Sequence, residues 1–375
     1  AGESRSLVMA AYTDQPVLKV KNDYTYRFLY GDPAGPAFAS AEEVVDYALG
    51  PSMPDIREKT AFFDGILSTP YLEGFSDDFR NLASVGFQGF IINTWWCVNG
   101  SGSRWYSIWE GNCHYHSTVD VEYNTAWFYL YFWPDLLRFN LEQWTGFEKG
   151  NAQGTYLSHD IGRYNHVYEQ TYPHDMPVEE NANWLLMAYA YWKQAGGGDL
   201  IRDFFDQARS YAEFILNCDS DGDGLPDLNV ANTVDQGSPA VQNAKNQTYL
   251  GIKTLAALRV AEEMALAQPV PDQALADACR ERVMLINHTL EDRTWTGDHF
   301  RVCDDSSIPA EEAEAYSIYP SNGLLWLLSS GIDPGLDQVN LERLRLDLAS
   351  ASAINRRTYG DVHSSLNNEN QWVSQ

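Results

Sequence analysis

Long stretches of helix-favouring sequence fill most of this chain after residue 40 and constrain its fold more than any other feature. Within residues 199–217, apolar side chains recur at helical spacing, which predicts a helix with one buried face. Similar patterns and start signals predict helices over residues 40–49, 54–66, 77–93, 122–145, 177–195, 199–217, 239–267, 271–291, 320–330 and 339–352. Short turns and long loops alternate between these segments, which favours a toroid of paired helices over a compact bundle. We therefore predict an all-α fold.

The first residues differ from this helical pattern. Residues 1–38 contain β-favouring stretches followed by a segment rich in Gly and Pro, which predicts strands and then a linker. The helical pattern begins at Ser40, the first residue of a capping box, and Gly50 is a stop signal. We expect two parts, a β-rich segment with a linker over residues 1–38 and a helical domain over residues 39–375.

Composition and charge limit the partners that this chain can bind. It has 52 acidic and 25 basic residues and a formal net charge of −27. Such a surface repels phosphate backbones and anionic lipids, so we expect neither nucleic acid binding nor membrane insertion. Aromatic residues make up 13% of the chain and supply many flat rings for a binding cleft. The five cysteines are scattered without a Cys-x-x-Cys pair, which favours neither a zinc site nor a disulfide framework.

The polar motifs of the chain lie in three long loops, residues 94–121, 146–176 and 218–238. Long loops in a compact domain are usually functional. Glycoside cleavage needs one carboxylate that attacks the sugar or activates water, and one carboxylic acid that protonates the leaving oxygen. Glu110 and Asp235, each in a polar loop before a helix, are the candidates. Trp109 and other aromatic and histidine side chains surround Glu110 in the sequence, and this environment can both desolvate and hydrogen-bond a carboxylate.

Further acidic and histidine residues in these loops have a functional and a structural interpretation. Asp120 is either a helix N-cap or a ligand of a sugar hydroxyl. His159 can bond a sugar hydroxyl while Asp160 orients its ring, or the two can form a structural pair that ties a loop to the wall. Glu179 and Glu180 stand in the first turn of a predicted helix. The helix dipole stabilises acidic side chains there, which is sufficient to explain the presence of at least one of them.

Acidic residues alternate with glycines in the loop after residue 218. Hard cations such as calcium prefer oxygen ligands in a tight turn of this kind. The expected ligands are Asp219, Asp221, Asp223 and Asp227. The glutamate that closes an EF-hand loop is absent, because Val230 stands at its position, and a solvated acidic turn is the alternative. We expect no cofactor for catalysis, and any calcium here would be structural.

Three sequence blocks occur in an order that is similar to a known superfamily. They are Glu-Gly at 110–111 with Ser-Thr-Val-Asp-Val at 117–121, His-Asp-Ile-Gly at 159–162, and Thr-Val-Asp at 233–235. Together they resemble the catalytic domain of retaining β-glycosidases of glycoside hydrolase families 52 (β-xylosidases) and 116 (β-glucosidases and non-lysosomal glucosylceramidases). The resemblance implies an (α/α)6 toroid with Glu110 as nucleophile and Asp235 as general acid/base. The residues expected to contact the substrate are Asp120, His159, Asp160, Thr233, Trp109 and Asn370.

A second resemblance competes in the middle of the chain. Residues 117–121 and the stretch Met-Pro-Val-Glu-Glu-Asn-Ala-Asn at 176–183 resemble fungal secreted glutaminase-A-like proteins, which share the toroid. Glu110 favours the glycosidase, because the Glu-Gly signal marks the nucleophile of the glycosidases. We expect a retaining exo-β-glycosidase that hydrolyses terminal β-linked glucose- or xylose-type sugars by double displacement. The alternatives are a glutaminase-like amidohydrolase on the same toroid and a non-catalytic carbohydrate-binding relative.

The resemblance also implies parts that this sequence does not contain. The relatives carry an N-terminal β-sandwich, for which 38 residues are too few, so the β-rich segment is expected to be its remnant. They also continue with a final helix or two after a segment like residues 364–372. We therefore expect a carbohydrate substrate and, as a further partner, a second copy or another chain that completes the fold. An extracellular or secreted protein is expected, with a cytoplasmic one as the alternative, since the start resembles a mature secreted protein.

Overall fold

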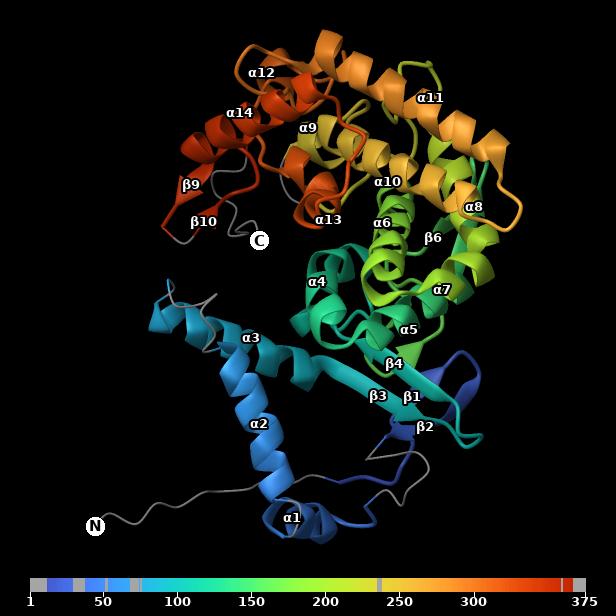
Figure 1. Ribbon diagram of the computed structural model, residues 1–375, viewed down its shortest axis with the longest axis vertical. Coiled ribbons are helices and arrows are strands. Elements are labelled where there is room, and N and C mark those ends of the chain that lie inside the picture. Colours follow the sequence, from blue (N-terminus) through green and yellow to red (C-terminus); the bar gives the residue numbers. More distant parts are fainter. Residues whose placement is uncertain are drawn as a thin grey trace. The chain divides into compact units, whose positions relative to one another are not determined.

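The computed structural model describes two compact units (Figure 1). Unit 1 comprises Ala1–Ser117 with Gly162–Tyr168, and unit 2 comprises Thr118–Ile161 with Glu169–Gln375. The residues described are 12–29, 38–50, 53–67, 74, 76–234, 238–358 and 360–366. The domain boundary near residue 38 stays a prediction of the sequence. The first unit extends further because strands from later in the chain complete its sheet.

Unit 1 contains a six-stranded sheet with the strand order β4-β3-β2-β1-β8-β7. Its strands are β1 (Leu18–Val20), β2 (Asp23–Phe28), β3 (Thr94–Val98), β4 (Arg104–Ile108), β7 (Gly162–Arg163) and β8 (His166–Val167). Neighbouring strands pair antiparallel, except that β1 and β8 are parallel. The all-α prediction is therefore not confirmed. Aromatic and β-branched residues of β3 and β4, separated by a Gly-containing turn, form a hairpin where a long loop was expected.

Three helices of unit 1 lie where the sequence placed them. They are α1 (Ala41–Leu49), α2 (Met53–Leu67) and α3 (Asp77–Asn93). The hydroxyl of Ser40 accepts the Glu43 amide at 3.2 Å, and that of Ser76 accepts the Phe79 amide at 3.3 Å. These side chains satisfy amides that have no partner within the helix, which is why the caps define where α1 and α3 begin.

Unit 2 is mostly helical. Its α-helices are α4 (Val119–Phe132), α5 (Pro134–Trp144), α6 (Pro177–Ala195), α7 (Gly198–Asp203), α8 (Phe205–Leu216), α9 (Pro239–Gln242), α10 (Thr248–Leu266), α11 (Gln273–Thr289), α12 (Ala310–Ala313), α13 (Leu325–Ser329) and α14 (Gln338–Asn355). Shorter elements are the 3₁₀ turns η3 (Thr145–Phe147) and η5 (Tyr319–Leu324), the π turn η4 (Leu290–Thr294), and the antiparallel pairs β5 (Glu148–Asn151) with β6 (Gly154–Leu157) and β9 (Arg356–Arg357) with β10 (Gly360–Asp361). Helix α10 packs against both α6 and α11 (Figure 1).

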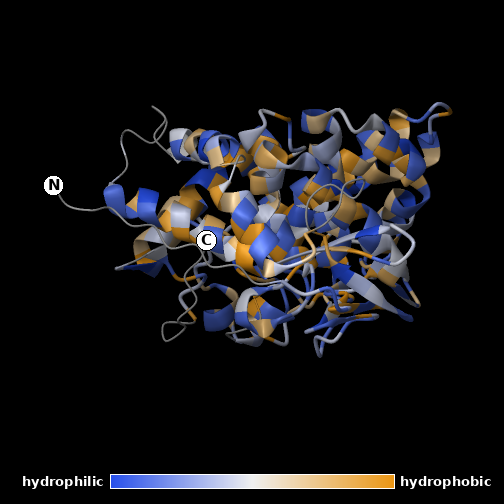
Figure 2. Ribbon diagram, turned by 90° about the horizontal axis from the view of Figure 1, so that it is seen from below, coloured by the Kyte–Doolittle hydropathy of each residue, from blue (hydrophilic) through white to orange (hydrophobic). Residues whose placement is uncertain are grey.

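The core of unit 2 surrounds α6 and α10. Every residue of α6 from Pro177 to Tyr191 is buried, and so is every residue of α10 from Thr248 to Leu258. Helices that are buried all round occur in the interior of a large domain. Hydrophobic residues nevertheless alternate with hydrophilic ones along the helical ribbons (Figure 2). Because this whole stretch of α6 is buried, its first turn places two glutamates in the interior.

Several predicted helices are interrupted. The segment 122–145 divides into α4 and α5, because Pro134 lacks an amide hydrogen and begins a new helix. The segment 199–217 divides at Phe204, and the segment 239–267 contains the short α9 and then α10. Among the described residues, no helix has both the length and the apolar character needed to cross a lipid bilayer.

Candidate active site

Buried polar side chains meet at the beginnings of two helices in unit 2. Asp120 stands in the first turn of α4, whose N-cap is Thr118, so Asp120 is not the N-cap that one interpretation of the sequence predicted. Glu179 and Glu180 stand in the first turn of α6. The exposed amides of a helix N-terminus favour negative charge, which helps to explain why carboxylates occupy both places.

Asp120 lies at the centre of this group and is 6% exposed. Its Oδ2 accepts a hydrogen bond of 2.6 Å from the hydroxyl of Thr233. Its Oδ1 lies 3.7 Å from Nε2 of His159 and accepts no hydrogen bond from the described residues. The structure thus brings together three of the residues that the sequence proposed as substrate ligands.

His159 is held in one orientation by its neighbours. Its Nδ1 lies 3.3 Å from Oδ2 of Asp160, and its ring stacks on Tyr172 with a centroid distance of 4.1 Å. Asp160 in turn accepts hydrogen bonds from the amide and hydroxyl of Thr171 and from the amide of Tyr172. A proton on Nδ1 would face the Asp160 carboxylate and leave the Nε2 lone pair directed toward Asp120.

Glu179 belongs to a buried ion pair behind this site. Its Oε1 accepts hydrogen bonds from the Tyr249 hydroxyl and, at 2.9 Å, from the Lys253 ammonium. The same ammonium lies 4.2 Å from the ring centroid of Tyr123, a cation–π distance. Glu179 Oε2 accepts the amide of Thr233 at 2.7 Å. Burial, followed by the charge of Glu179, raises the pKa of Tyr249 well above its usual value. This ion pair fixes the backbone of Thr233.

Glu180 is fully buried and accepts fewer hydrogen bonds than Glu179. Its Oε2 accepts a hydrogen bond of 3.0 Å from Asn183, while Oε1 accepts none from the described residues. Burial first, and then the charges of Asp120 and Glu179, raise its pKa well above the usual value for a glutamate. One ligand atom each of Asp120, His159 and Glu180 lie within 4.8 Å of one another. Such crowding of carboxylates is relieved by a proton or by a cation.

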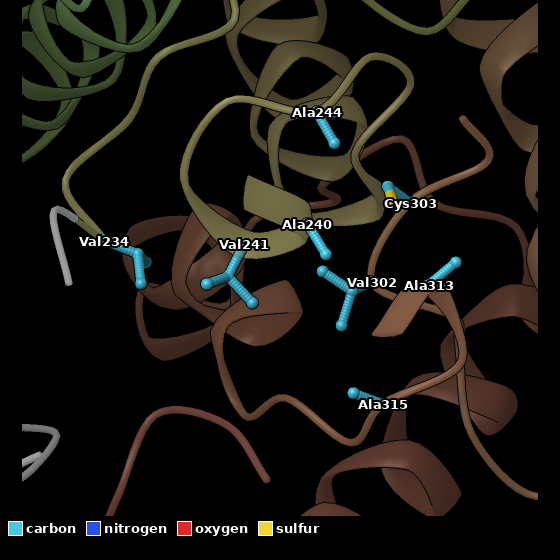
Figure 3. Close-up of a cluster of buried hydrophobic side chains, with 8 residues drawn as sticks. All are labelled: Val234, Ala240, Val241, Ala244, Val302, Cys303, Ala313 and Ala315. Carbon is cyan, nitrogen blue, oxygen red and sulfur yellow. The ribbon is translucent and has the colours of Figure 1, made fainter. Parts of the chain in front are cut away.

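The loop that carries Thr233 is anchored on both sides. The Asn232 side chain donates to the Val241 carbonyl at 2.8 Å and accepts the Val234 amide at 2.7 Å. Val234 is 5% exposed and points into an apolar cluster that is drawn in Figure 3. The members of this cluster are Val234, Ala240, Val241, Ala244, Val302, Cys303, Ala313 and Ala315. The threonine hydroxyl therefore keeps a defined position opposite Asp120.

Only one of the two carboxylates that the sequence proposed as catalytic lies in the part of the chain that the structure describes. Glu110 belongs to unit 1, where it precedes the 3₁₀ turn η2 (Gly111–Cys113) and its amide donates to the Tyr115 carbonyl at 2.9 Å. Asp235 lies outside the described residues, as does Asn370. Trp109, also in unit 1, donates its indole N–H to Nε2 of His116 and to the Tyr164 carbonyl. The retaining pair Glu110 and Asp235 stays a prediction.

The acidic loop after residue 218 contains a narrower group than expected. Asp219, Asp221 and Asp223 have carboxylate oxygens within 4.8 Å of one another, whereas Asp227 does not belong to this group. Asp227 instead accepts hydrogen bonds from the amide and hydroxyl of Ser220. Salt bridges join Asp219 to an arginine at 3.1 Å and Asp223 to another arginine, and these charges compensate two of the carboxylates. Calcium in this loop stays a proposal.

Sequence reasoning missed the ion pair behind the site. The helix dipole was taken as a sufficient explanation for at least one of Glu179 and Glu180, and neither Tyr249 nor Lys253 was proposed. A signal was present in the sequence. Lys253 stands within a mostly apolar stretch of α10, which predicts that it is buried. A lysine is almost never buried unless it is paired, so this pattern indicates an acidic partner.

Comparisons with known proteins identify the helical part of the chain. The family described as "Glutaminase A six helical-hairpin domain" matches residues 107–299. "Glutaminase A" of Aspergillus oryzae is 26% identical over 233 residues, which are 60% of this chain and 30% of that protein. The chain thus spans about a third of the length of that curated relative.

A solved structure is also similar, at a lower level. A rhamnosidase from Klebsiella oxytoca with rhamnose bound is 14% identical, with a TM-score of 0.40, over 66% of this chain and 46% of that one. The resemblance to glutaminase-A-like proteins is confirmed, and the resemblance to glycoside hydrolase families 52 and 116 stays a prediction. Because the family match covers more than half of its 375 residues, the chain belongs to the glutaminase A six helical-hairpin domain family.

Proposed function

We propose that this chain forms the reaction centre of a hydrolase and that a primary carboxamide, such as the side chain of glutamine, is its substrate class. One observation carries the proposal. Asp120 is buried at a helix N-terminus, with one carboxylate oxygen fixed by the Thr233 hydroxyl at 2.6 Å and the other directed toward His159. The choice of a carboxamide is supported by membership of the glutaminase A family and by the name of the relative.

The reaction proposed for this centre is the hydrolysis of an amide bond. The oxygen of a water molecule adds to the carbonyl carbon, one proton of that water is transferred to the leaving nitrogen, and the carbon–nitrogen bond breaks to give ammonia and a carboxylic acid. Asp120 is placed to orient and deprotonate that water, because Thr233 holds its carboxylate in one rotamer. The glutamate and histidine beside it supply further groups through which the proton can return to the leaving nitrogen.

Glycoside hydrolysis, which was the first prediction from the sequence, is the second candidate. It is favoured by the carboxyl groups of Asp120 and Glu180, which lie close together and have different hydrogen-bond donors, Thr233 and Asn183. Retaining glycosidases use two carboxyl groups about 5 to 5.5 Å apart. The more specific prediction of an exo-β-glycosidase on glucose- or xylose-type sugars, with Glu110 and Asp235, stands as a proposal beside it. A non-catalytic carbohydrate-binding protein remains the third alternative.

One experiment separates these candidates. The purified protein is assayed for ammonia release from L-glutamine and for hydrolysis of a panel of nitrophenyl β-glycosides. We expect ammonia release, and we expect Asp120→Asn to reduce kcat/KM by about a thousandfold or more, as for loss of a group that acts in the reaction. The matched control is Asp206→Asn, which changes an exposed acid in the first turn of α8 and should leave the rate unchanged.

The outcomes of this experiment differ clearly. Glycoside hydrolysis without ammonia release would replace the amidohydrolase by the second candidate. Equal activity of wild type and Asp120→Asn on glutamine would show that the reaction takes place elsewhere in the protein. Binding of sugars without turnover of either substrate class would favour the third candidate.

A further inference from the structure

Three side chains of the candidate active site share one arrangement. In each, one polar atom is fixed by a neighbouring residue while a second polar atom faces the group. Thr233 fixes Oδ2 of Asp120, and Asn183 fixes Oε2 of Glu180. Asp160 lies beside Nδ1 of His159. Residues that bind metal ions are typically held in this way by an outer shell of hydrogen bonds, and a carboxylate beside a histidine ligand is one of the recurring cases.

The charges of the site favour the binding of a cation. The Lys253 ammonium is bound to Glu179, and Asp160 is satisfied by three hydrogen bonds. Among the described residues, no lysine or arginine forms an ion pair with Asp120 or Glu180. Their Oδ1 and Oε1 are buried and accept no hydrogen bond from those residues. Two buried carboxylates that form no ion pair with a lysine or arginine among the described residues carry the charge that one divalent ion would neutralise, and buried charges are normally paired or bound to metal.

We propose that Asp120, His159 and Glu180 bind one divalent first-row transition-metal ion, with Zn²⁺ the first to test. One imidazole nitrogen and two carboxylate oxygens suit such an ion, whereas calcium and magnesium prefer oxygen ligands alone. Three protein ligands leave a fourth position open for water, as in catalytic zinc sites. The proposal rests on the proposed function and deepens it: the ion would lower the pKa of the attacking water, and Asp120 would then act by holding the ion rather than by deprotonating the water itself.

The geometry needs only small adjustments to accept the ion. Ligand atoms about 2.0 to 2.2 Å from a tetrahedral Zn²⁺ lie roughly 3.4 Å from one another. Asp120 Oδ1 and His159 Nε2 are already 3.7 Å apart, and Glu180 lies within 4.8 Å of both residues. A movement of the Glu180 side chain on the order of 1 Å would complete the set.

The test measures metal binding without reference to activity. The protein is stripped with a chelator, dialysed, and titrated with ZnCl₂ by calorimetry, with bound zinc counted by mass spectrometry. We expect one ion per chain, and we expect Glu180→Gln and Asp120→Asn to weaken binding by at least about 100-fold. Thr233→Val, which removes only the group that holds Asp120, should weaken binding by about 10-fold. Asp221→Asn is the matched control, because it changes the other acidic group and should leave the affinity unchanged.

Circular dichroism of each variant establishes that it is folded before the titration is interpreted. Failure of the folded wild-type protein to bind zinc would overturn the proposal, and so would binding that is lost in Asp221→Asn and kept in Glu180→Gln. Ammonia release that persists in the presence of a chelator would overturn the proposed metal site and would leave the proposed amide hydrolysis unaffected. Binding of one zinc ion per chain without amide hydrolysis would support the metal site and would contradict the proposed function.

Discussion

Lys253 shows how a single buried side chain holds the candidate active site in place. Its side chain is 1% exposed, and its ammonium donates hydrogen bonds to Glu179 and to the Tyr249 hydroxyl, while Glu179 also accepts the amide of Thr233. Removing one partner of a buried ion pair leaves the other charge uncompensated, which costs more than the pair itself contributes. Lys253 thus acts on the position of Thr233 through Glu179, which bonds both residues.

Replacement of this lysine should destabilise the protein strongly. We expect Lys253→Met to lower the free energy of unfolding by about 3 to 5 kcal/mol, measured by urea denaturation. Lys193→Met is the matched control, since this lysine of α6 forms a partly exposed pair with Glu263 and should cost about 1 kcal/mol or less. The double variant Glu179→Gln with Lys253→Met should lose less stability than Lys253→Met alone. Equal losses for Lys253→Met and Lys193→Met would contradict this account.

At this scale the sequence predicted several site residues but not their surroundings. Asp120, His159, Asp160 and Thr233 were proposed from their motifs, and the structure places them side by side. The role of Glu179 was not predicted, because a glutamate in a helix first turn has the same sequence pattern whether the helix end faces solvent or the interior.

Helix α14 is connected to the chain before it by one buried carboxyl group. Oδ1 of Asp347 accepts the amide of Phe300 at 2.9 Å, and Asp347 is 1% exposed. Burial raises the pKa of this aspartate to about 7. The aspartate therefore stays protonated in the folded protein at pH values where it is ionised in the unfolded chain.

This difference predicts a pH dependence of stability. As the pH rises from about 4 to about 7, the unfolded chain loses the proton of Asp347 while the folded protein keeps it, so the free energy of unfolding falls. The contribution is on the order of 4 kcal/mol. Asp347→Asn should remove it and flatten the urea-unfolding profile over this range. Glu342→Gln, at an exposed position of the same helix, should leave the profile unchanged. The same slope in wild type and Asp347→Asn would contradict the assignment.

The sequence was most reliable for elements with local start and stop signals. Helices α3 and α6 were predicted with the residue bounds they have, 77–93 and 177–195. Strands β3 and β4 were taken for a loop, because a strand is stabilised by partners elsewhere in the chain and its own residues give a weaker signal. Proline decided the break between α4 and α5.

The whole molecule carries a large excess of negative charge, which acts on stability through repulsion at long range. With a formal charge of −27 at pH 7, the compact state is destabilised by its own field. Salt screens this repulsion, since the Debye length falls from about 30 Å at 0.01 M to about 8 Å at 0.15 M.

Stability should therefore rise with salt at neutral pH. We expect the melting temperature at pH 7 to increase between 0.01 and 0.15 M NaCl, measured by calorimetry. Near the isoelectric point of about 4.5 the net charge is close to zero, and the increase should be much smaller. A rise of the same size at both pH values would show that salt acts by another mechanism.

The sequence by itself determined the capped helices, the large excess of acidic residues, and the short motifs at 117–121 and 176–183 that resemble the glutaminase-A-like proteins. Each of these depends on residues that are neighbours in the chain. Only the tertiary structure decided that Asp120 meets Thr233, 113 residues away, and that both glutamates of α6 are buried. The physical reason is that burial and contacts between distant residues follow from the packing of whole helices, and desolvation then sets the charge of each group.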